Sequence, residues 1–221
     1  MSAPAPLFTD AERERIRVAV AEAETRTAGE IVPYVVRRSG SYDVATWRLA
    51  SLVALGSGML ALGWAWLNDG WGWSWLYTAW ALALVMTAGG VAGAVLSLLP
   101  ALRRLAAGPE ALDETVHRRA ALAFVEEEVF DTRDRTGILL FVSLFEHRIE
   151  VVGDAGINAK VEPHEWHEVV DLIRQGIRQH TLADGLVEAV QRCGDLLHRR
   201  GVEVRTDDTD ELSDDVRVRD D

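Results

Sequence analysis

Asp154 has the setting in this sequence that best suits the binding of a ligand. It follows a predicted strand at residues 148–152, and Gly153 and Gly156 stand on either side of it. Sheets of α/β proteins often bind ligands beyond the ends of their strands, and glycines allow a ligand to approach the backbone closely. We expect Asp154 to be a catalytic residue or a ligand of Ca²⁺ or Mg²⁺, ions that prefer several oxygen ligands.

Glu30 is the second candidate metal ligand, because it begins a predicted strand at residues 30–37 that would pair close to Asp154. Both residues also have a purely structural interpretation. Asp154 would order its own turn through nearby backbone amides, and Glu30 would cap the junction between a helix and a strand. Two carboxylates fall short of full calcium coordination, so both interpretations stay open.

Other reactive residue types favour structural roles. His164 and His167 are three residues apart, whereas the helical motif of zinc proteases needs two histidines four residues apart on one face. Cys193 shares an apolar helical stripe with Val190 and Leu197, which indicates a buried thiol. The sequence has no phosphate-binding P-loop and no Cys/His zinc spacing, so it gives no indication of nucleotide or zinc use.

The elements that must position these residues are helices and strands on both sides of one long apolar stretch. Thr9 and Glu12 form a capping box before a first helix, in which Glu24 falls on the polar face. The apolar run at residues 137–145 is typical of a central strand buried on both faces. Pro33 lacks an N–H, so strand 30–37 is expected at a sheet edge or a bulge. Further helices are predicted at residues 111–130, at residues 163–180, and from a cap at Asp184 to Gly201.

The order of these elements predicts a three-layer α/β sandwich, with a small central mixed sheet and helices on both faces. We expect a first part at residues 1–48, an insertion at residues 49–102, a second part at residues 103–202, and an acidic flexible tail at residues 203–221.

The insertion is predicted to be a transmembrane helical hairpin. Its limbs, residues 49–67 and 75–102, contain no charged residue, and each is long enough to cross a hydrocarbon core of about 30 Å. Six of the eight tryptophans lie between Trp64 and Trp80, around the turn, and indole side chains favour the membrane–water interface. The pairs Gly89/Gly93 and Ala54/Gly58 would pack the hairpin on itself or dock it to a partner membrane protein.

Arginines flank the hairpin on both sides, at positions 37, 38 and 48 before it and 103 and 104 after it. Because positive charge stays on the cytoplasmic side, the sequence predicts a multi-pass protein of the bacterial inner membrane with both termini cytoplasmic. The net charge of −12 argues against nucleic acid as a partner. The single cysteine, Cys193, excludes an intrachain disulfide.

Four segments resemble the TPM domain family in their order and residues: TAGEI at 27–31, RTGILLFVS at 135–143, VGDAGI at 152–157 with Trp166 after it, and DELSD at 210–214. In the last segment, Asp and Ser stand where the family usually has Asn and Pro. The resemblance covers most of residues 9–40 and 111–216, but not the hairpin. It implies an α/β sandwich, frequent membrane association, and calcium binding and acid phosphatase activity in some members.

Two functions follow from these observations. The first is a membrane-anchored interaction, assembly or accessory module for membrane proteins, because no complete catalytic constellation accompanies the anchor. The alternative is a weak acid phosphatase that uses Ca²⁺ or Mg²⁺ at Asp154. The sequence leaves open whether the protein is an enzyme.

Overall fold

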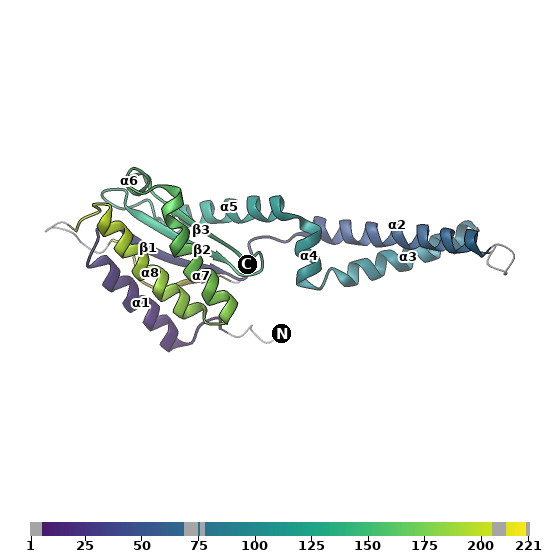
Figure 1. The fold of residues 1–221 in the computed structure, drawn as a ribbon, viewed down its shortest axis with the longest axis horizontal. Helices are drawn as coiled ribbons and strands as arrows, with labels where there is room; N and C mark the ends of the chain where they lie inside the picture. The colour runs from purple at the N-terminus through teal and green to yellow at the C-terminus, as the bar shows by residue number, and fades with distance from the viewer. Residues whose placement is uncertain (1–5, 69–74, 76–77, 205–210, 220–221) are drawn as a thin grey trace. The chain divides into compact units, whose positions relative to one another are not determined.

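The computed structural model describes residues 6–68, 75, 78–204 and 211–219 (Figure 1). The chain divides into two compact units. Residues 1–39 together with 115–221 form one, called here the α/β unit. Residues 40–114 form the other, called the hairpin unit.

The α/β unit is built on a four-stranded mixed sheet with the order β3-β2-β1-β4. β1 (Glu30–Val36) runs parallel to β2 (Gly137–Ser143), and β2 runs antiparallel to β3 (Arg148–Gly153). β4 (Arg217–Arg219) lies parallel to β1 on its other side. Every residue of β1 and β2 is buried, as in strands that are covered on both faces.

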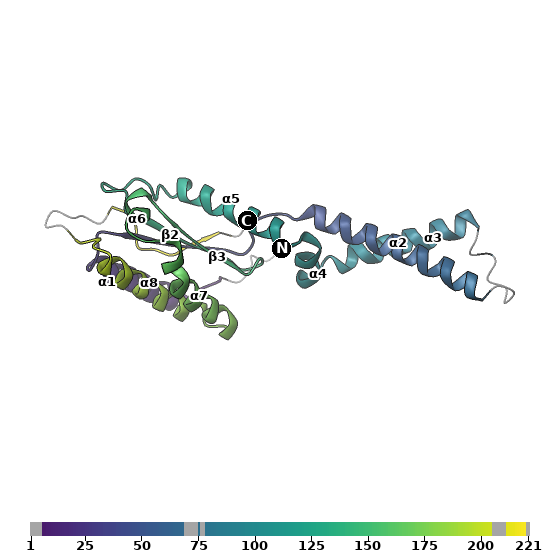
Figure 2. The ribbon, with the colours of Figure 1, turned by 45° about the horizontal axis from the view of Figure 1, so that its top comes forward.

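Helices cover both faces of this sheet (Figure 2). α1 (Asp10–Glu24), α7 (His167–Gln179) and α8 (Leu182–Arg199) pack on one face. The second half of α5 (Pro109–Glu126) packs on the other face. The short helices α6 (Ala155–Asn158) and η2 (Pro163–Trp166) complete the unit. The predicted three-layer α/β sandwich is therefore confirmed.

The side chains of β1 contribute alternately to two separate hydrophobic cores. Ile31 and Val35 belong to the core beneath α1, α7 and α8. Val32, Tyr34 and Val36 belong to the core beneath α5. Successive side chains of a strand point to opposite faces, so one apolar strand anchors both helical layers.

The predicted helix starts were partly right. The capping box at Thr9 is present, with the backbone N–H of Thr9 donating to Glu12 Oε2 at 2.8 Å. Asp184 does not cap α8, because that helix begins earlier, at Leu182. Asp184 lies in its first turn and accepts a hydrogen bond from Arg15 Nη2 at 2.5 Å.

The edge position expected for the strand around Pro33 was wrong, since β1 lies inside the sheet. The physical reason is that β4 pairs only with residues 34–36 of β1. The N–H of Glu30 bonds to Thr136 on the β2 side and that of Arg37 bonds to Arg219 on the β4 side. Backbone groups alternate in direction along a strand, so the missing N–H of Pro33 faces the β4 side, before that pairing begins.

The acidic C-terminal stretch was expected to be flexible, but residues 211–219 lie along the sheet. This part is called here the C-terminal segment. Its apolar side chains are divided between the two cores: Leu212 packs against the core beneath α5, and Val216 and Val218 pack in the other. One buried and two partly buried apolar side chains, together with the β4 pairing, order a sequence whose overall composition is polar.

The hairpin unit contains α2 (Asp43–Leu67), α3 (Ala79–Leu96) and α4 (Pro100–Ala107). α2 and α3 are both long and apolar enough to cross a membrane. The second limb was expected to continue to residue 102, but α3 ends at Leu96. A separate helix begins at Pro100, whose ring cannot follow on within a continuous helix.

Small residues hold α2 and α3 together. A Cβ on Gly93 would lie 2.8 Å from the Cα of Ala50 and the carbonyl oxygen of Leu49, and a Cβ on Gly89 would lie 2.2 Å from Ser57 Oγ. Ser57 Oγ donates to the Ala54 carbonyl of its own helix at 2.8 Å and also lies 3.4 Å from the Val85 carbonyl of α3. Of the two roles considered for the Gly89/Gly93 pair, these contacts place it in the packing of the hairpin on itself.

We predict that Gly93→Leu will destabilise the hairpin, because its side chain would collide with the backbone of α2 rather than with a flexible side chain. The expected result is a melting temperature several degrees lower in detergent, with more aggregate on size exclusion. Gly63→Leu is the matched control, since a Cβ on Gly63 meets nothing within 4 Å. Equal effects of the two substitutions would contradict the packing role of Gly93.

Candidate functional site

Asp154 lies directly after β3 and caps α6. Its Oδ1 accepts a hydrogen bond from the backbone N–H of Ala155 at 2.7 Å. Arg135 forms an ion pair with this carboxylate: its Nη2 donates a hydrogen bond to Oδ1 at 3.0 Å, and its Nε lies 2.7 Å from Oδ2. Oδ2 is buried and accepts no hydrogen bond within the described residues. Asp154 is only 5% exposed. A buried carboxylate needs compensating charge and hydrogen bonds; Arg135 supplies the charge, and Arg135 and the start of α6 supply hydrogen bonds to Oδ1.

Glu30 begins β1 and faces a different part of the chain. Its carboxylate accepts the backbone N–H groups of Glu211 and Leu212, both at 3.4 Å. β2 separates it from Asp154, because Gly137 pairs with Glu30 on one side and its carbonyl accepts the Asp154 N–H at 2.9 Å on the other. Two strand spacings correspond to about 10 Å between the backbones. The two predicted residues therefore share one end of the sheet without meeting.

The surroundings of Asp154 do not fit a cation. A metal bound there would have to displace Arg135, whose guanidinium holds both carboxylate oxygens. Within the described residues, no group of three or more His, Cys, Asp or Glu side chains is placed to hold a metal ion. The Ca²⁺ or Mg²⁺ site expected at Asp154 and Glu30 stays a prediction.

Three carboxyl groups instead meet at the start of β1, and they are called here the carboxylate cluster: Glu24, Glu30 and Asp214. Glu24 is the last residue of α1, and its Oε1 accepts the N–H of Ile31 at 2.8 Å. Asp214 comes from the C-terminal segment. Its Oδ1 is buried with no hydrogen-bond partner in the described part of the chain, and its Oδ2 lies 4.0 Å from Arg17 Nη1.

Burial raises the pKa of Glu24 to about 9. The negative charges of Glu30 and Asp214 add to this rise, while the hydrogen bond from Ile31 opposes it. Glu24 is therefore protonated at neutral pH, beside the carboxyl groups of Glu30 and Asp214. The proton on Glu24 removes the repulsion that an ionised Glu24 would exert on Asp214 of the C-terminal segment.

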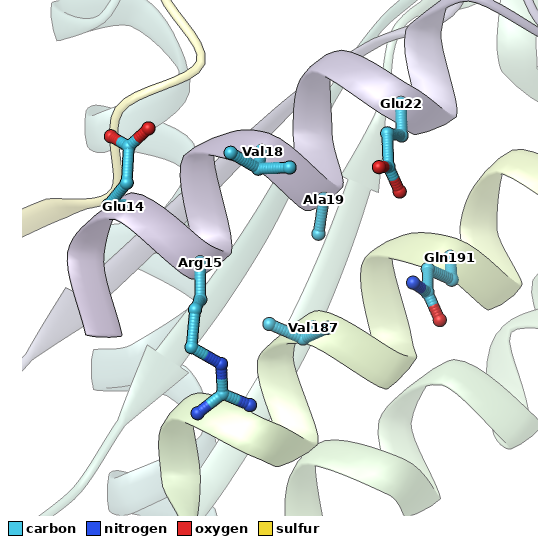
Figure 3. Close-up of a pocket in the computed structure, with 7 residues that line it drawn as sticks. All are labelled: Glu14, Arg15, Val18, Ala19, Glu22, Val187 and Gln191. Carbon is cyan, nitrogen blue, oxygen red and sulfur yellow. The ribbon is translucent and has the colours of Figure 1, made fainter. Parts of the chain in front are cut away.

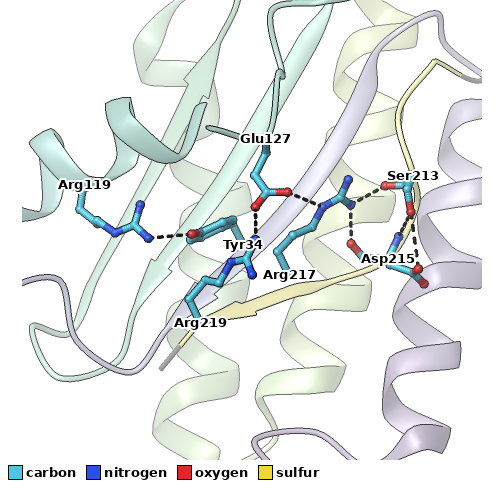
Figure 4. A network of polar contacts seen from close by, with 7 residues as sticks. All are labelled: Tyr34, Arg119, Glu127, Ser213, Asp215, Arg217 and Arg219. Carbon is cyan, nitrogen blue, oxygen red and sulfur yellow. Dashed lines mark hydrogen bonds and ion pairs between the residues drawn. The ribbon is translucent and has the colours of Figure 1, made fainter. Parts of the chain in front are cut away.

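A second polar network holds the other end of the C-terminal segment (Figure 4). Glu127 accepts hydrogen bonds from Arg217 Nε at 3.3 Å and from Arg219 Nη2 at 2.9 Å. Arg217 also donates to the backbone carbonyl of Asp215 at 2.5 Å. The arginines of β4 thus meet a carboxylate that follows α5, so the segment is bound at both ends.

Tyr34 of β1 lies beside the same network, in the core beneath α5 (Figure 4). Its ring stacks on Phe141 with centroids 5.6 Å apart, and its hydroxyl accepts from Arg119 Nη2 at 2.9 Å. Burial raises the pKa of the phenol, and the nearby guanidinium groups of Arg119 and Arg219 oppose this rise. The tyrosine is therefore a neutral link between the sheet and its arginines.

Sequence reasoning missed the roles of Glu24 and Asp214. Glu24 was assigned to the polar, solvent-facing side of the first helix, but the C-terminal segment half-buries it. Asp214 lies in the quoted DELSD segment, whose first residue, Asp210, is outside the described residues. The available signal was the spacing of Leu212 and Val216, which is unusual in an otherwise polar tail.

Structural roles for the other candidates agree with their surroundings. Cys193 is fully buried, and burial raises the pKa of its thiol far above the neutral range. His164, in η2, and His167, the first residue of α7, are both exposed.

An open groove between α1 and α8 has a volume of about 270 Å³ and is lined by Arg15, Val18, Val187 and Gln191 among others (Figure 3). Glu14 and Glu22 lie along its rim, and their carboxylates do not converge on Arg15 (Figure 3). It offers a shallow apolar surface rather than a reaction centre.

We predict that Glu24→Gln will make the protein more stable at alkaline pH. The folded-state pKa of about 9 exceeds the ordinary value of 4.5. The folded chain thus holds a proton that the unfolded chain releases, and the free energy of unfolding falls as pH rises between these values. A glutamine keeps the hydrogen bond from Ile31 without needing the proton, since its amide oxygen accepts from Ile31 and its amide group carries no negative charge beside Asp214.

The expected gain at pH 8.5 is about 1–3 kcal/mol in the free energy of unfolding, with little change at pH 5. Chemical denaturation in detergent at a series of pH values measures it. Glu188→Gln, at an exposed position of α8, is the control and should leave the pH slope unchanged. A variant at position 24 that keeps the wild-type slope would show that Glu24 does not carry the proton.

No family model and no curated protein matches this chain. Among solved structures, the chain is similar to the NMR structure of the BA42 protein from the psychrophilic bacterium Bizionia argentinensis. The TM-score is 0.60 at 18% sequence identity, and the match covers 99% of this chain and 100% of the other. At this identity the likeness concerns the fold, and it agrees with the α/β architecture described above.

Proposed function

We propose that this protein is a membrane-anchored interaction or assembly module for membrane proteins, with a TPM-type α/β unit on the cytoplasmic side of a bacterial inner membrane. The observation that carries the proposal is the exposed apolar surface of α2 and α3. Only 11% and 17% of their most apolar windows are buried, whereas a core helix of a soluble protein would be mostly buried.

The dimensions of the two helices support a bilayer as the environment of this surface. At 1.5 Å per residue, the 25 residues of α2 span about 38 Å and the 18 residues of α3 about 27 Å. The hydrocarbon core is about 30 Å thick. The side chains that remain exposed are large and apolar; those most exposed include Leu52, Met59, Leu60, Trp66, Leu84 and Val91.

The pairing of β1 with β2 supports a hairpin rather than a single crossing. These strands lie on either side of the hairpin in sequence and form one parallel pair, so the chain must return to the side from which it left. Arginines flank the apolar parts of α2 and α3: Arg37 and Arg38 precede α2, Arg48 lies in its second turn, and Arg103 and Arg104 follow α3. They favour the cytoplasm as that side.

The contacts of Asp154 favour an interaction module over a phosphatase. The proposed phosphatase needs this carboxylate for a metal or a reacting group, and Arg135 and the start of α6 already engage it. Pairing Asp154 with Arg135 explains its burial without any ligand.

We predict that reporters will place the turn of the hairpin and the C-terminal segment on opposite sides of the membrane. Alkaline phosphatase fused after Asn68 should be active and a fluorescent protein there dark, because the turn would be periplasmic. Fusions after Arg219 should give the reverse result. Activity assays in whole cells measure both, and a fluorescent fusion at Asn68 would contradict the topology.

We further predict that the protein, extracted in a mild detergent, migrates on a native gel in an assembly larger than its own 24.4 kDa chain in a micelle. Cross-linking in intact membranes before extraction should capture the same assembly. As a control, Asp154→Asn should leave the assembly intact if this residue has only a local structural role. A chain that migrates alone under all these conditions would contradict the assembly role.

A further inference from the structure

β3 forms one edge of the sheet, and no strand in the described part of the chain pairs with its outer side. All six residues of β3 pair with β2 in one unbroken register, without a bulge or a proline. Strand edges of this kind are usually paired or protected, because their row of N–H and C=O groups accepts a further strand. The outer edge of β3 is therefore a candidate interaction surface of the α/β unit.

The alternation of the backbone fixes which groups of β3 point outward. The N–H of Asp154 donates to the carbonyl of Gly137 at 2.9 Å, so the even-numbered residues of β3 direct their backbone groups toward β2. The N–H and C=O groups of Ile149 and Val151 consequently face away from the sheet. Neither residue has a further hydrogen bond within the described residues, so both are open to an added strand.

The chain itself closes one end of this edge. The carbonyl of Gly153 also faces outward, but it accepts a hydrogen bond from Nδ2 of Asn158 at 2.5 Å. An added antiparallel strand can thus bond to Ile149 and Val151 but not across Gly153. For a second copy of β3, two registers then centre the pairing within the open stretch, one on Ile149 and the other on Glu150.

The charges on β3 decide between these two registers. Arg148 and Glu150 are two residues apart and lie on the same face of the strand. Pairing centred on Glu150 would set this carboxylate directly opposite its own copy, and such like charges destabilise a sheet. Pairing centred on Ile149 sets Arg148 of each chain opposite Glu150 of the other, which gives two ion pairs. In that register the edge is complementary to itself.

Both charged side chains already have contacts within their own chain. Oε1 of Glu150 lies 2.5 Å from Nδ1 of His117 on α5, whereas its Oε2 has no partner in the part of the chain that the structure describes. Arg148 also interacts within its own chain, and a guanidinium has five N–H donors to share among acceptors. The cross-strand pair therefore uses the second carboxylate oxygen of Glu150 and adds to the contact with His117.

We propose that β3 pairs with β3 of a second copy of this chain, antiparallel and centred on Ile149, so that two four-stranded sheets become one continuous sheet. The inference rests on the proposed assembly role and names the partner as the chain itself. A strand of another protein would need a basic and an acidic residue at the same two positions, whereas a second copy always supplies them. Anchoring in one membrane also raises the effective concentration of the copies for each other.

Charge reversal in the full chain tests the pairing. The dimer is measured by sedimentation velocity in a mild detergent over a range of protein concentrations. Arg148→Glu and Glu150→Arg should each weaken the dimer by about tenfold, because each sets like charges opposite one another at two places. The double variant exchanges the two charges and should recover the wild-type dimer. Arg178→Glu, at an exposed position of α7, is the matched control and should change nothing.

Cysteine cross-linking in native membranes tests the register. Two differently tagged chains are expressed together, one with Arg148→Cys and the other with Glu150→Cys, and the membranes are treated with a mild oxidant. In the proposed register these positions form a pair that is not hydrogen-bonded, with Cα atoms about 4.5 Å apart, a distance that a disulfide spans. A disulfide between the two tags is expected, and Cys193 should not compete because it is buried. Cross-links only between two Glu150→Cys chains would overturn the register.

The possible results also distinguish this inference from the function on which it rests. A double charge variant that stays as weak as the single ones would overturn the β3 pairing. An assembly that contains other proteins but only one copy of this chain, shown by pull-down of one tag without the other, would also overturn it and leave the assembly role standing. A chain that is alone in every condition would contradict both proposals.

Discussion

The parallel pairing of β1 with β2 is the interaction on which the rest of this structure depends. Residues 37–136, with both long apolar helices, lie between these two strands in the sequence. Parallel neighbours always need a crossover connection, which is usually a single helix packed on the sheet. Here the crossover contains an entire second unit, and α5 alone returns to cover one face of the sheet. The hairpin is therefore an insertion between two strands that still pair directly with each other.

The C-terminal segment covers the edge of β1 that does not face β2. β1 is buried on both faces and its second edge would be open without β4. The segment covers that edge only where β1 has N–H groups to offer, and Glu24 accepts the N–H of Ile31 where β4 does not reach. Pro33 falls between these two regions and needs no partner for its nitrogen. The backbone N–H groups on this edge of β1 are therefore accounted for in three ways: β4 pairs with residues 34–36, Pro33 has no N–H, and the side chain of Glu24 accepts the N–H of Ile31.

Much of this architecture could be predicted from local patterns. The capping box at Thr9 and the apolar run of β2 are recognisable from neighbouring residues alone, and both were predicted correctly. β4 could not be predicted in this way, because three apolar residues in an acidic tail give a weak signal until the sheet edge is known. Asp154 and Glu30 were chosen for good local reasons, yet their partners, Arg135 and residues 211–212, depend on how distant segments meet. The carboxylate cluster is of the same kind, since Glu24 appears solvent-facing within its own helix.

The proline in β1 has a meaning for biosynthesis as well as for the folded state. At about 5–20 residues per second, the ribosome needs about 5–20 s to make the hundred or so residues between β1 and β2. During that time the apolar strand IVPYVV has no partner in the sheet. A proline in the middle of such a strand hinders its pairing with other unfinished chains. Pro33 thus disfavours such pairing during the interval that the long insertion between β1 and β2 imposes, and the finished sheet accommodates this proline where β4 does not pair with β1.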